Sequence, residues 1–165
     1  MSRISHAAVT AATALAAVTV AASPASAWTG GSTSAGLSSP IEMLVGTART
    51  TCLSSTLSGT ITASGALSIT SALFANCMHA IGSITVFAQN LPWSSYLSGG
   101  LTALAGVRLN IATCIYGGNL TGTYTGSASP VAASFSGTLT KVSGPLYCPN
   151  TTTFSSAYVF TGPGL

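Results

Sequence analysis

The sequence predicts an all-β protein, an antiparallel sandwich or barrel with two disulfides inside one domain. Three observations predict this class. Apolar and polar residues alternate with a period of two in several short segments. Glycine, proline and asparagine separate these segments at short intervals. No segment shows the apolar stripe of an amphipathic helix, and the outward positions carry Ser and Thr, of which Thr favours strands. Short strands spaced in this way are typical of sandwiches and barrels.

The chain of 165 residues begins with a segment typical of a secretory signal, which we expect to span residues 1–27. Arg3 supplies the basic start, residues 7–22 form an apolar run, and Ala25-Ser-Ala27 is a cleavage site. The apolar run is shorter than the roughly 20 residues that span a bilayer. We therefore expect a secreted, extracellular protein that begins at Trp28, with no transmembrane segment in the mature chain. Its alanine-rich signal is typical of a bacterial protein.

Residues 28–49 are rich in Gly and Ser and show no periodicity, so we expect a flexible N-terminal lead-in there. A single β domain is expected to follow at residues 50–165. Alternation within it is clearest in four segments, 67–73, 84–88, 107–111 and 131–140. The last of these is the most regular, with hydroxyl side chains on its outward face.

A weak internal repeat relates residues 50–90 to residues 107–160. Thr51-Cys52 followed by Leu57-Ser-Gly59-Thr60 recurs as Thr113-Cys114 followed by Leu120-Thr-Gly122-Thr123. Each half then reaches a second cysteine that follows an aromatic residue. Four cysteines in an oxidising compartment favour two disulfides, for which three pairings are possible. The repeat favours one bridge in each half, Cys52–Cys77 and Cys114–Cys148.

Charged residues are scarce from Trp28 onward: one acidic residue, three basic residues and one histidine, namely Glu42, Arg49, Arg108, Lys141 and His79. One carboxylate cannot serve a mechanism that needs two, and a triad would need Glu42 to orient His79. Three basic residues are too few for a nucleic-acid-binding patch. We expect no catalytic residue, no metal site and no cofactor. His79 is then a loop residue near a disulfide, Arg108 faces solvent, and Glu42 can pair with Arg49.

Trp93 and Tyr96 are the candidate ligand or interface residues, in the loop Leu91-Pro-Trp93-Ser-Ser-Tyr96. An exposed pair of this kind could stack on a sugar or lie at an oil–water interface. Alternatively, Trp93 plugs one end of a barrel. An exposed and coplanar pair would favour carbohydrate binding, and a buried Trp93 would count against it.

Several motifs occur together between about residues 50 and 160. They are Ile69-Thr-Ser-Ala-Leu-Phe74-Ala-Asn-Cys77, Asn90-Leu-Pro-Trp93, Gly106-Val, Cys114 with the glycines 118 and 122, and Cys148. In these motifs the chain resembles the small secreted bacterial "activator of alkane oxidation" proteins. The resemblance implies an exported, non-catalytic β protein that assists the use of apolar substrates.

Two functions follow as expectations. The first is a secreted accessory or surface-active protein whose partner is a hydrophobic substrate or cell-surface material. The alternative is a secreted binding module for carbohydrate or for a partner protein. A hydrolase is a third and weaker interpretation, because the chain offers so few acids and bases.

Overall fold

Ten strands and no helix make up the regular structure of residues 28–165, the part that the computed structural model describes. The expected signal at 1–27 lies outside the described residues. The strands are β1 (Gly31–Val45), β2 (Ala48–Ile61), β3 (Ala66–His79), β4 (Gly82–Ile84), β5 (Val86–Gln89), β6 (Trp93–Ser98), β7 (Leu101–Ile111), β8 (Cys114–Thr125), β9 (Val131–Ser143) and β10 (Thr151–Thr161).

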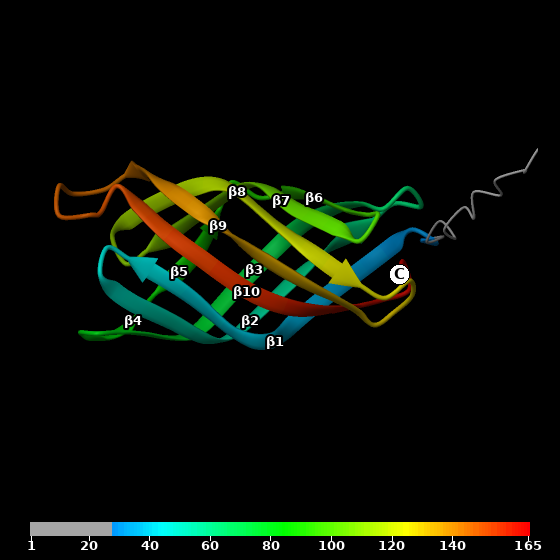
Figure 1. The fold of residues 1–165 in the computed structure, drawn as a ribbon, viewed down its shortest axis with the longest axis horizontal. Coiled ribbons are helices and arrows are strands. Elements are labelled where there is room, and N and C mark those ends of the chain that lie inside the picture. The colour runs from blue at the N-terminus through cyan, green and yellow to red at the C-terminus, as the bar shows by residue number, and fades with distance from the viewer. Residues whose placement is uncertain (1–27) are drawn as a thin grey trace, which may run out of the picture.

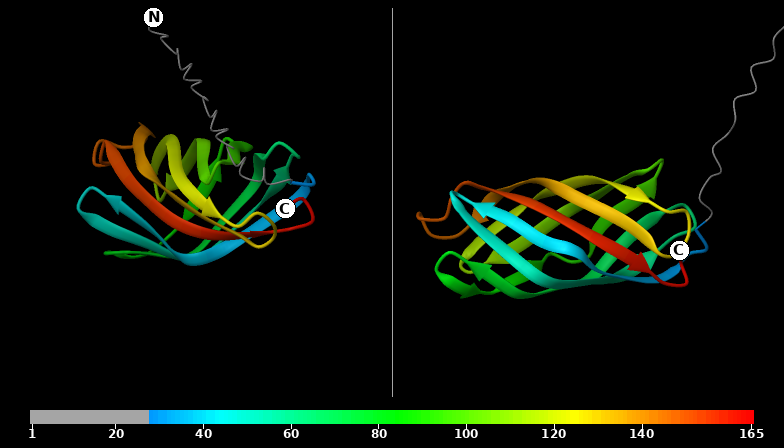
Figure 2. Two further views of the ribbon diagram at one scale, coloured as in Figure 1. Left: turned by 45° about the vertical axis from the view of Figure 1, so that its right-hand side comes forward. Right: turned by 60° about the horizontal axis from the view of Figure 1, so that its bottom comes forward.

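Eight of these strands close into an antiparallel barrel (Figure 1). Their order around the wall is β1, β2, β3, β6, β7, β8, β9 and β10, and β10 pairs back onto β1. Apart from the detour through β4 and β5, each strand lies beside its neighbour in the sequence, which is the meander arrangement of up-and-down barrels. The second panel of Figure 2 shows the strands running obliquely around the long axis. The expected all-β class is confirmed, and the architecture is a barrel.

Two short strands occupy the detour between β3 and β6. β4 pairs with the last residues of β3, and β5 pairs with the last residues of β7. β6 pairs with the first halves of β3 and β7. The wall between β3 and β7 is therefore formed by β6 over one half of its length and by β4 and β5 over the other.

The two ends of the barrel differ. We call one the disulfide end, formed by the turns 45–48, 79–82 and 111–114 and by the loop 143–151. The other, which we call the terminal end, is formed by the turns 61–66, 98–101 and 125–131 together with Trp28 and Leu165. In Figure 1 the disulfide end lies at the left and the C-terminus at the right.

Side chains fill the barrel. Every strand except the short β4 contributes buried residues, and the aromatic rings of Phe135, Tyr158 and Phe160 pack edge-on or tilted against one another. The cavity that remains at the centre has a volume of about 10 Å³. That is close to the space of a single water molecule. The barrel is therefore a packed core and not a container.

The predicted alternation is confirmed in β7 and β9, where Val107, Leu109 and Ile111 and the odd positions of 131–139 face inward. It is wrong in the second half of β3, where Leu73 is 66% exposed and Ala72 is buried. The register between β2 and β3 shifts at Thr70, which opposes no residue of β2. One extra residue exchanges the inward and outward faces of everything that follows it.

The prediction of a flexible lead-in at residues 28–49 is wrong. Most of this segment is β1, which pairs with both β2 and β10, and Ile41 and Met43 are buried in the core. Two features hide the strand in the sequence. Its first inward positions hold the small residues Thr33 and Ala35, and a register shift follows Gly36. The β domain thus includes residues before position 50.

Both expected disulfides form. Cys52 and Cys77 lie directly opposite each other on β2 and β3, with their Cα atoms 3.9 Å apart. Cys114, at the start of β8, is joined to Cys148 in the loop before β10, with a Cα separation of 5.8 Å. Disulfides of this kind form in oxidising environments.

Candidate functional site

The disulfide end carries the most exposed apolar side chains of the described residues. Leu146 is 101% exposed, Ile81 is 88% exposed and Tyr147 is 73% exposed. We call these three residues the apolar tips. Other exposed apolar side chains near this end are Leu44, Met78, Phe87 and Val142. Apolar side chains gathered on one part of a surface mark an interaction site, whereas isolated ones need no explanation.

The loop that carries two of the apolar tips is held in place by several contacts. The Cys148 amide donates to the Pro145 carbonyl at 3.0 Å, and the Lys141 ammonium donates to the Cys148 carbonyl at 3.0 Å. The Tyr147 hydroxyl shares a hydrogen bond of 2.9 Å with the Thr113 hydroxyl. The Cys114–Cys148 disulfide ties the loop to β8. The structure therefore imposes the exposure of Leu146 and Tyr147.

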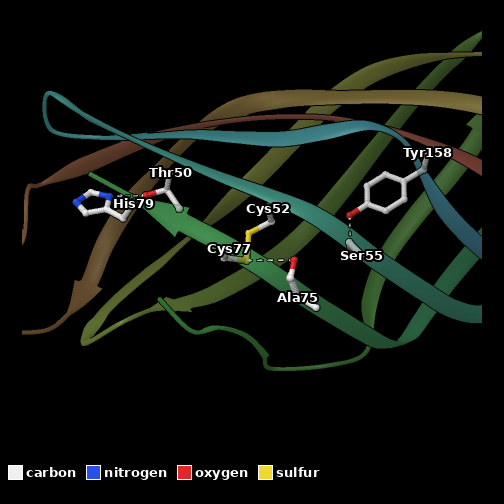
Figure 3. Close-up of a disulfide and its surroundings, with 7 residues drawn as sticks. All are labelled: Thr50, Cys52, Ser55, Ala75, Cys77, His79 and Tyr158. Carbon is white, nitrogen blue, oxygen red and sulfur yellow. Dashed lines mark hydrogen bonds between the residues drawn. A yellow bond between two sulfur atoms is a disulfide. The ribbon is translucent and has the colours of Figure 1, made fainter. Parts of the chain in front are cut away.

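A pocket of about 290 Å³ lies between the two loops that bear the apolar tips. Most of its lining is apolar, and its polar contributors include His79 and Thr50. In Figure 3 these two side chains face each other, with His79 Nδ1 2.7 Å from Thr50 Oγ1. The lining residues are Val45, Thr50, His79, Ile81, Ile84, Ile111, Ala112, Thr113, Cys114, Tyr147 and Pro149. Its volume is near the lower limit of small-molecule pockets, about 300 Å³.

His79 lies at the end of β3, near the Cys52–Cys77 disulfide (Figure 3). Its hydrogen-bond partner is a hydroxyl and not a carboxylate. Glu42 instead accepts a hydrogen bond of 3.2 Å from Arg49 Nη1, which is the surface pair expected from the sequence. Within the described part of the chain, no group of three His, Cys, Asp or Glu residues is placed to hold a metal ion. The exposed apolar tips and the mostly apolar pocket lining present an apolar contact surface.

Trp93 and Tyr96 do not form the site suggested by the sequence. Trp93 is only 2% exposed, faces the central cavity, and donates from Nε1 to the Gln89 carbonyl at 2.9 Å. Tyr96 is 45% exposed on the outer face of the same strand, β6. Successive side chains of a strand alternate between its faces, so residues three apart point in opposite directions. Trp93 is a core residue. It is buried, as in the alternative interpretation, but it lines the central cavity and does not plug one end of the barrel.

The apolar tips were not among the site residues predicted from the sequence. A signal for them was present, because Ile81 precedes Gly82 and Leu146 follows Gly144-Pro145, and Gly and Pro favour turns. A turn that is exposed to water rarely has a structural use for a large apolar side chain. Large apolar residues inside predicted turns would have identified this end of the barrel.

The fold and the site together define a class: a filled, eight-stranded meander barrel with two disulfides and apolar side chains at one end. The chain matches no protein-family model, and neither a curated protein nor a solved structure matches it. Within residues 28–165, no helix has the length and apolar character needed to cross a membrane.

Proposed function

We propose that this protein is a secreted, non-catalytic accessory protein that binds apolar surfaces through its disulfide end. Its partner is then a hydrophobic substrate or the apolar material of a cell surface. The observation that carries the proposal is the display of the apolar tips, which are 73–101% exposed. Two of them, Leu146 and Tyr147, lie on a loop fixed by hydrogen bonds and a disulfide. The signal expected at 1–27 and the two disulfides support secretion.

The energetics of apolar contact favour this end. Full burial of a side chain the size of Leu or Ile contributes about 1.5–3 kcal/mol. Three tips that enter an apolar phase together therefore supply several kcal/mol. The loop that carries Leu146 and Tyr147 loses little conformational freedom on binding, since its contacts already order it.

The alternative, a carbohydrate-binding module, has less support. Its expected platform was an exposed Trp93 beside Tyr96, and Trp93 lies in the core. Tyr147 remains as an exposed ring at the disulfide end, but its hydroxyl is engaged by Thr113.

A partition experiment tests the proposal. The protein from Trp28 onward is mixed with hexadecane droplets, and the bound fraction is measured after flotation. The triple variant Ile81→Ser, Leu146→Ser and Tyr147→Ser should bind at least about tenfold more weakly, because the burial described above is lost. Circular dichroism checks that the variant retains its fold.

The matched control is the pair Leu53→Ser and Leu73→Ser. These side chains are 62% and 66% exposed on the outer wall of β2 and β3, five and six residues along their strands from the turns of the disulfide end. Droplet binding of this control should equal that of the wild type. An equal loss in both variants would show that apolar exposure anywhere on the barrel serves, and binding to insoluble polysaccharide but not to droplets would support the alternative.

A further inference from the structure

Every acidic, basic or histidine side chain of residues 28–165 lies in the half of the barrel nearest the disulfide end. Glu42 and Arg49 flank the turn between β1 and β2, and His79 ends β3. Arg108 and Lys141 lie within three residues of the ends of β7 and β9. The terminal end carries no charged side chain in the described part. The charges thus surround the apolar tips.

The positive charges of this ring are largely free of acidic partners. Arg49 is bonded to Glu42, and that pair is the one salt bridge found within residues 28–165. The Arg108 guanidinium lies along the outer wall beside Gly117, where a Cβ atom would be 3.9 Å from its Nε. Lys141 uses one of its three donors for the Cys148 carbonyl. With His79 neutral, the disulfide end has a formal charge of +2 from these side chains.

We propose that the apolar surface taken by the disulfide end is an anionic lipid surface, with lipid phosphates around Arg108 and Lys141. This inference rests on the proposed function, because the apolar tips supply the insertion. Lysine and arginine side chains near such a surface attract it, whereas a neutral hydrocarbon surface offers them nothing. The charge complementarity selects a lipid layer over bare hydrocarbon.

The spacing along the strands agrees with this orientation. Arg108 is three residues before the end of β7, and Lys141 is two residues before the end of β9. At a rise of about 3.3 Å per residue, they lie roughly 7–10 Å behind the rim along their strands. Interfacial amphipathic helices bury their apolar face by about 5–10 Å, which we take as the depth for the apolar tips. When the tips are inserted, the basic side chains therefore lie at the depth of the headgroups.

The test compares binding to vesicles of phosphatidylcholine alone with binding to vesicles that also contain phosphatidylglycerol. The measured quantity is the ratio of the two partition coefficients. Glu42→Gln releases Arg49 and should raise this ratio about fivefold, while Arg108→Gln should lower it about fivefold. Glu42→Gln should have little effect on stability, because an exposed ion pair contributes little. Arg108→Gln changes a side chain on the outer wall, away from the core.

A control places charge at the opposite end. Ser127 is exposed in the turn between β8 and β9, and Ser127→Lys adds one positive charge there. This variant should keep the wild-type ratio, because charges more than about 10 Å from the contact are screened at 0.1 M salt. If Ser127→Lys raises the ratio as much as Glu42→Gln, the preference for anionic lipid depends on net charge and not on the charges at the disulfide end. That result would overturn the inference.

The remaining outcomes separate the inference from the proposed function. Equal binding to both vesicle types, insensitive to Glu42→Gln and Arg108→Gln, would overturn the inference and leave apolar binding intact. Absence of binding to vesicles and to hexadecane droplets would overturn the proposed function itself. Competition by inorganic phosphate at constant ionic strength would show a site for the free anion, and would also overturn the lipid assignment.

Discussion

At the scale of single residues, polar groups inside the barrel couple its stability to pH. The Tyr158 hydroxyl is buried against the Ser55 hydroxyl at 2.9 Å. Desolvation by burial raises the pKa of Tyr158 to about 12 from 10, although the Ser55 hydrogen bond lowers it somewhat. The folded protein therefore holds this proton at a pH where the unfolded chain has lost it.

The direction of the effect follows from linkage. The contribution that protonated Tyr158 makes to the free energy of unfolding is complete below pH 10. It is lost as the pH rises from 10 towards 12. Each pH unit in that window removes about 1.4 kcal/mol from the free energy of unfolding. Tyr158→Phe should be less stable than the wild type at pH 8, by about 1–3 kcal/mol, because it leaves the Ser55 hydroxyl buried without a partner. By pH 11 the difference in the free energy of unfolding between Tyr158→Phe and the wild type should be smaller, because only the wild type loses stability through this phenol.

Denaturant unfolding at the two pH values measures this difference, and Ser55→Ala is the control. It removes the same hydrogen bond but keeps the phenol, so it should lose stability with pH at least as steeply as the wild type. Parallel pH profiles for the wild type and Tyr158→Phe would show that Tyr158 does not control alkaline unfolding.

At the scale of the strands, the sequence predicted the regular elements and failed where the regularity breaks. β7 from Val107 onward was predicted because large residues occupy every inward position, and β9 because Val131, Phe135 and Leu139 face inward while hydroxyl residues face outward. The face change in β3 depends on one unpaired residue, Thr70, and nothing in the local sequence distinguishes it. The strand β1 was missed because small residues hide the inward face at its start. Period-two reasoning needs large residues on one face and an unbroken register.

Two glycines of the proposed repeat lie where a side chain would collide with the neighbouring strand. A Cβ at Gly59 on β2 would lie 1.9 Å from the Ser68 carbonyl oxygen, and one at Gly122 on β8 would lie 1.6 Å from that of Ser134. Both obstacles are backbone atoms within a paired sheet, which cannot move aside without breaking ladder contacts. The corresponding Leu-x-Gly-Thr motifs thus share a steric role.

We expect Gly59→Ala and Gly122→Ala each to reduce the free energy of unfolding by about 3 kcal/mol, at the upper end of overpacking costs. Gly36→Ala on β1 is the matched control, because a Cβ atom added there would have open space for 4 Å around it. That control should change stability by no more than about 0.5 kcal/mol. Chemical denaturation of the three variants measures their free energies of unfolding. Equal free energies of unfolding for all three would refute the steric role.

At the scale of the whole molecule, the barrel has a packed interior, and the candidate site lies at its disulfide end. The packed interior could be foreseen from the alternation, since inward positions hold large apolar residues. The candidate site could not, because it needs the topology to bring the turn at Ile81 beside the loop at Tyr147, residues 66 positions apart in the sequence. Only the closed barrel places the two loops around one pocket.

The filled interior leads to a last prediction about how the protein would handle hydrocarbon. A central cavity of about 10 Å³ cannot hold an alkane, so the core cannot carry hydrocarbon, and the proposed function predicts binding at the surface of an apolar phase. At constant hexadecane volume, the amount of bound protein should rise in proportion to the total droplet area as the droplets are made smaller. If the barrel carried hydrocarbon inside, each protein would instead bind one alkane molecule, and the bound amount would saturate whatever the droplet size. Flotation of emulsions of known size distribution measures the dependence. A saturable one-to-one complex with dissolved alkane would place the binding in the 290 Å³ pocket at the disulfide end, because that pocket and not the core has room for a small ligand.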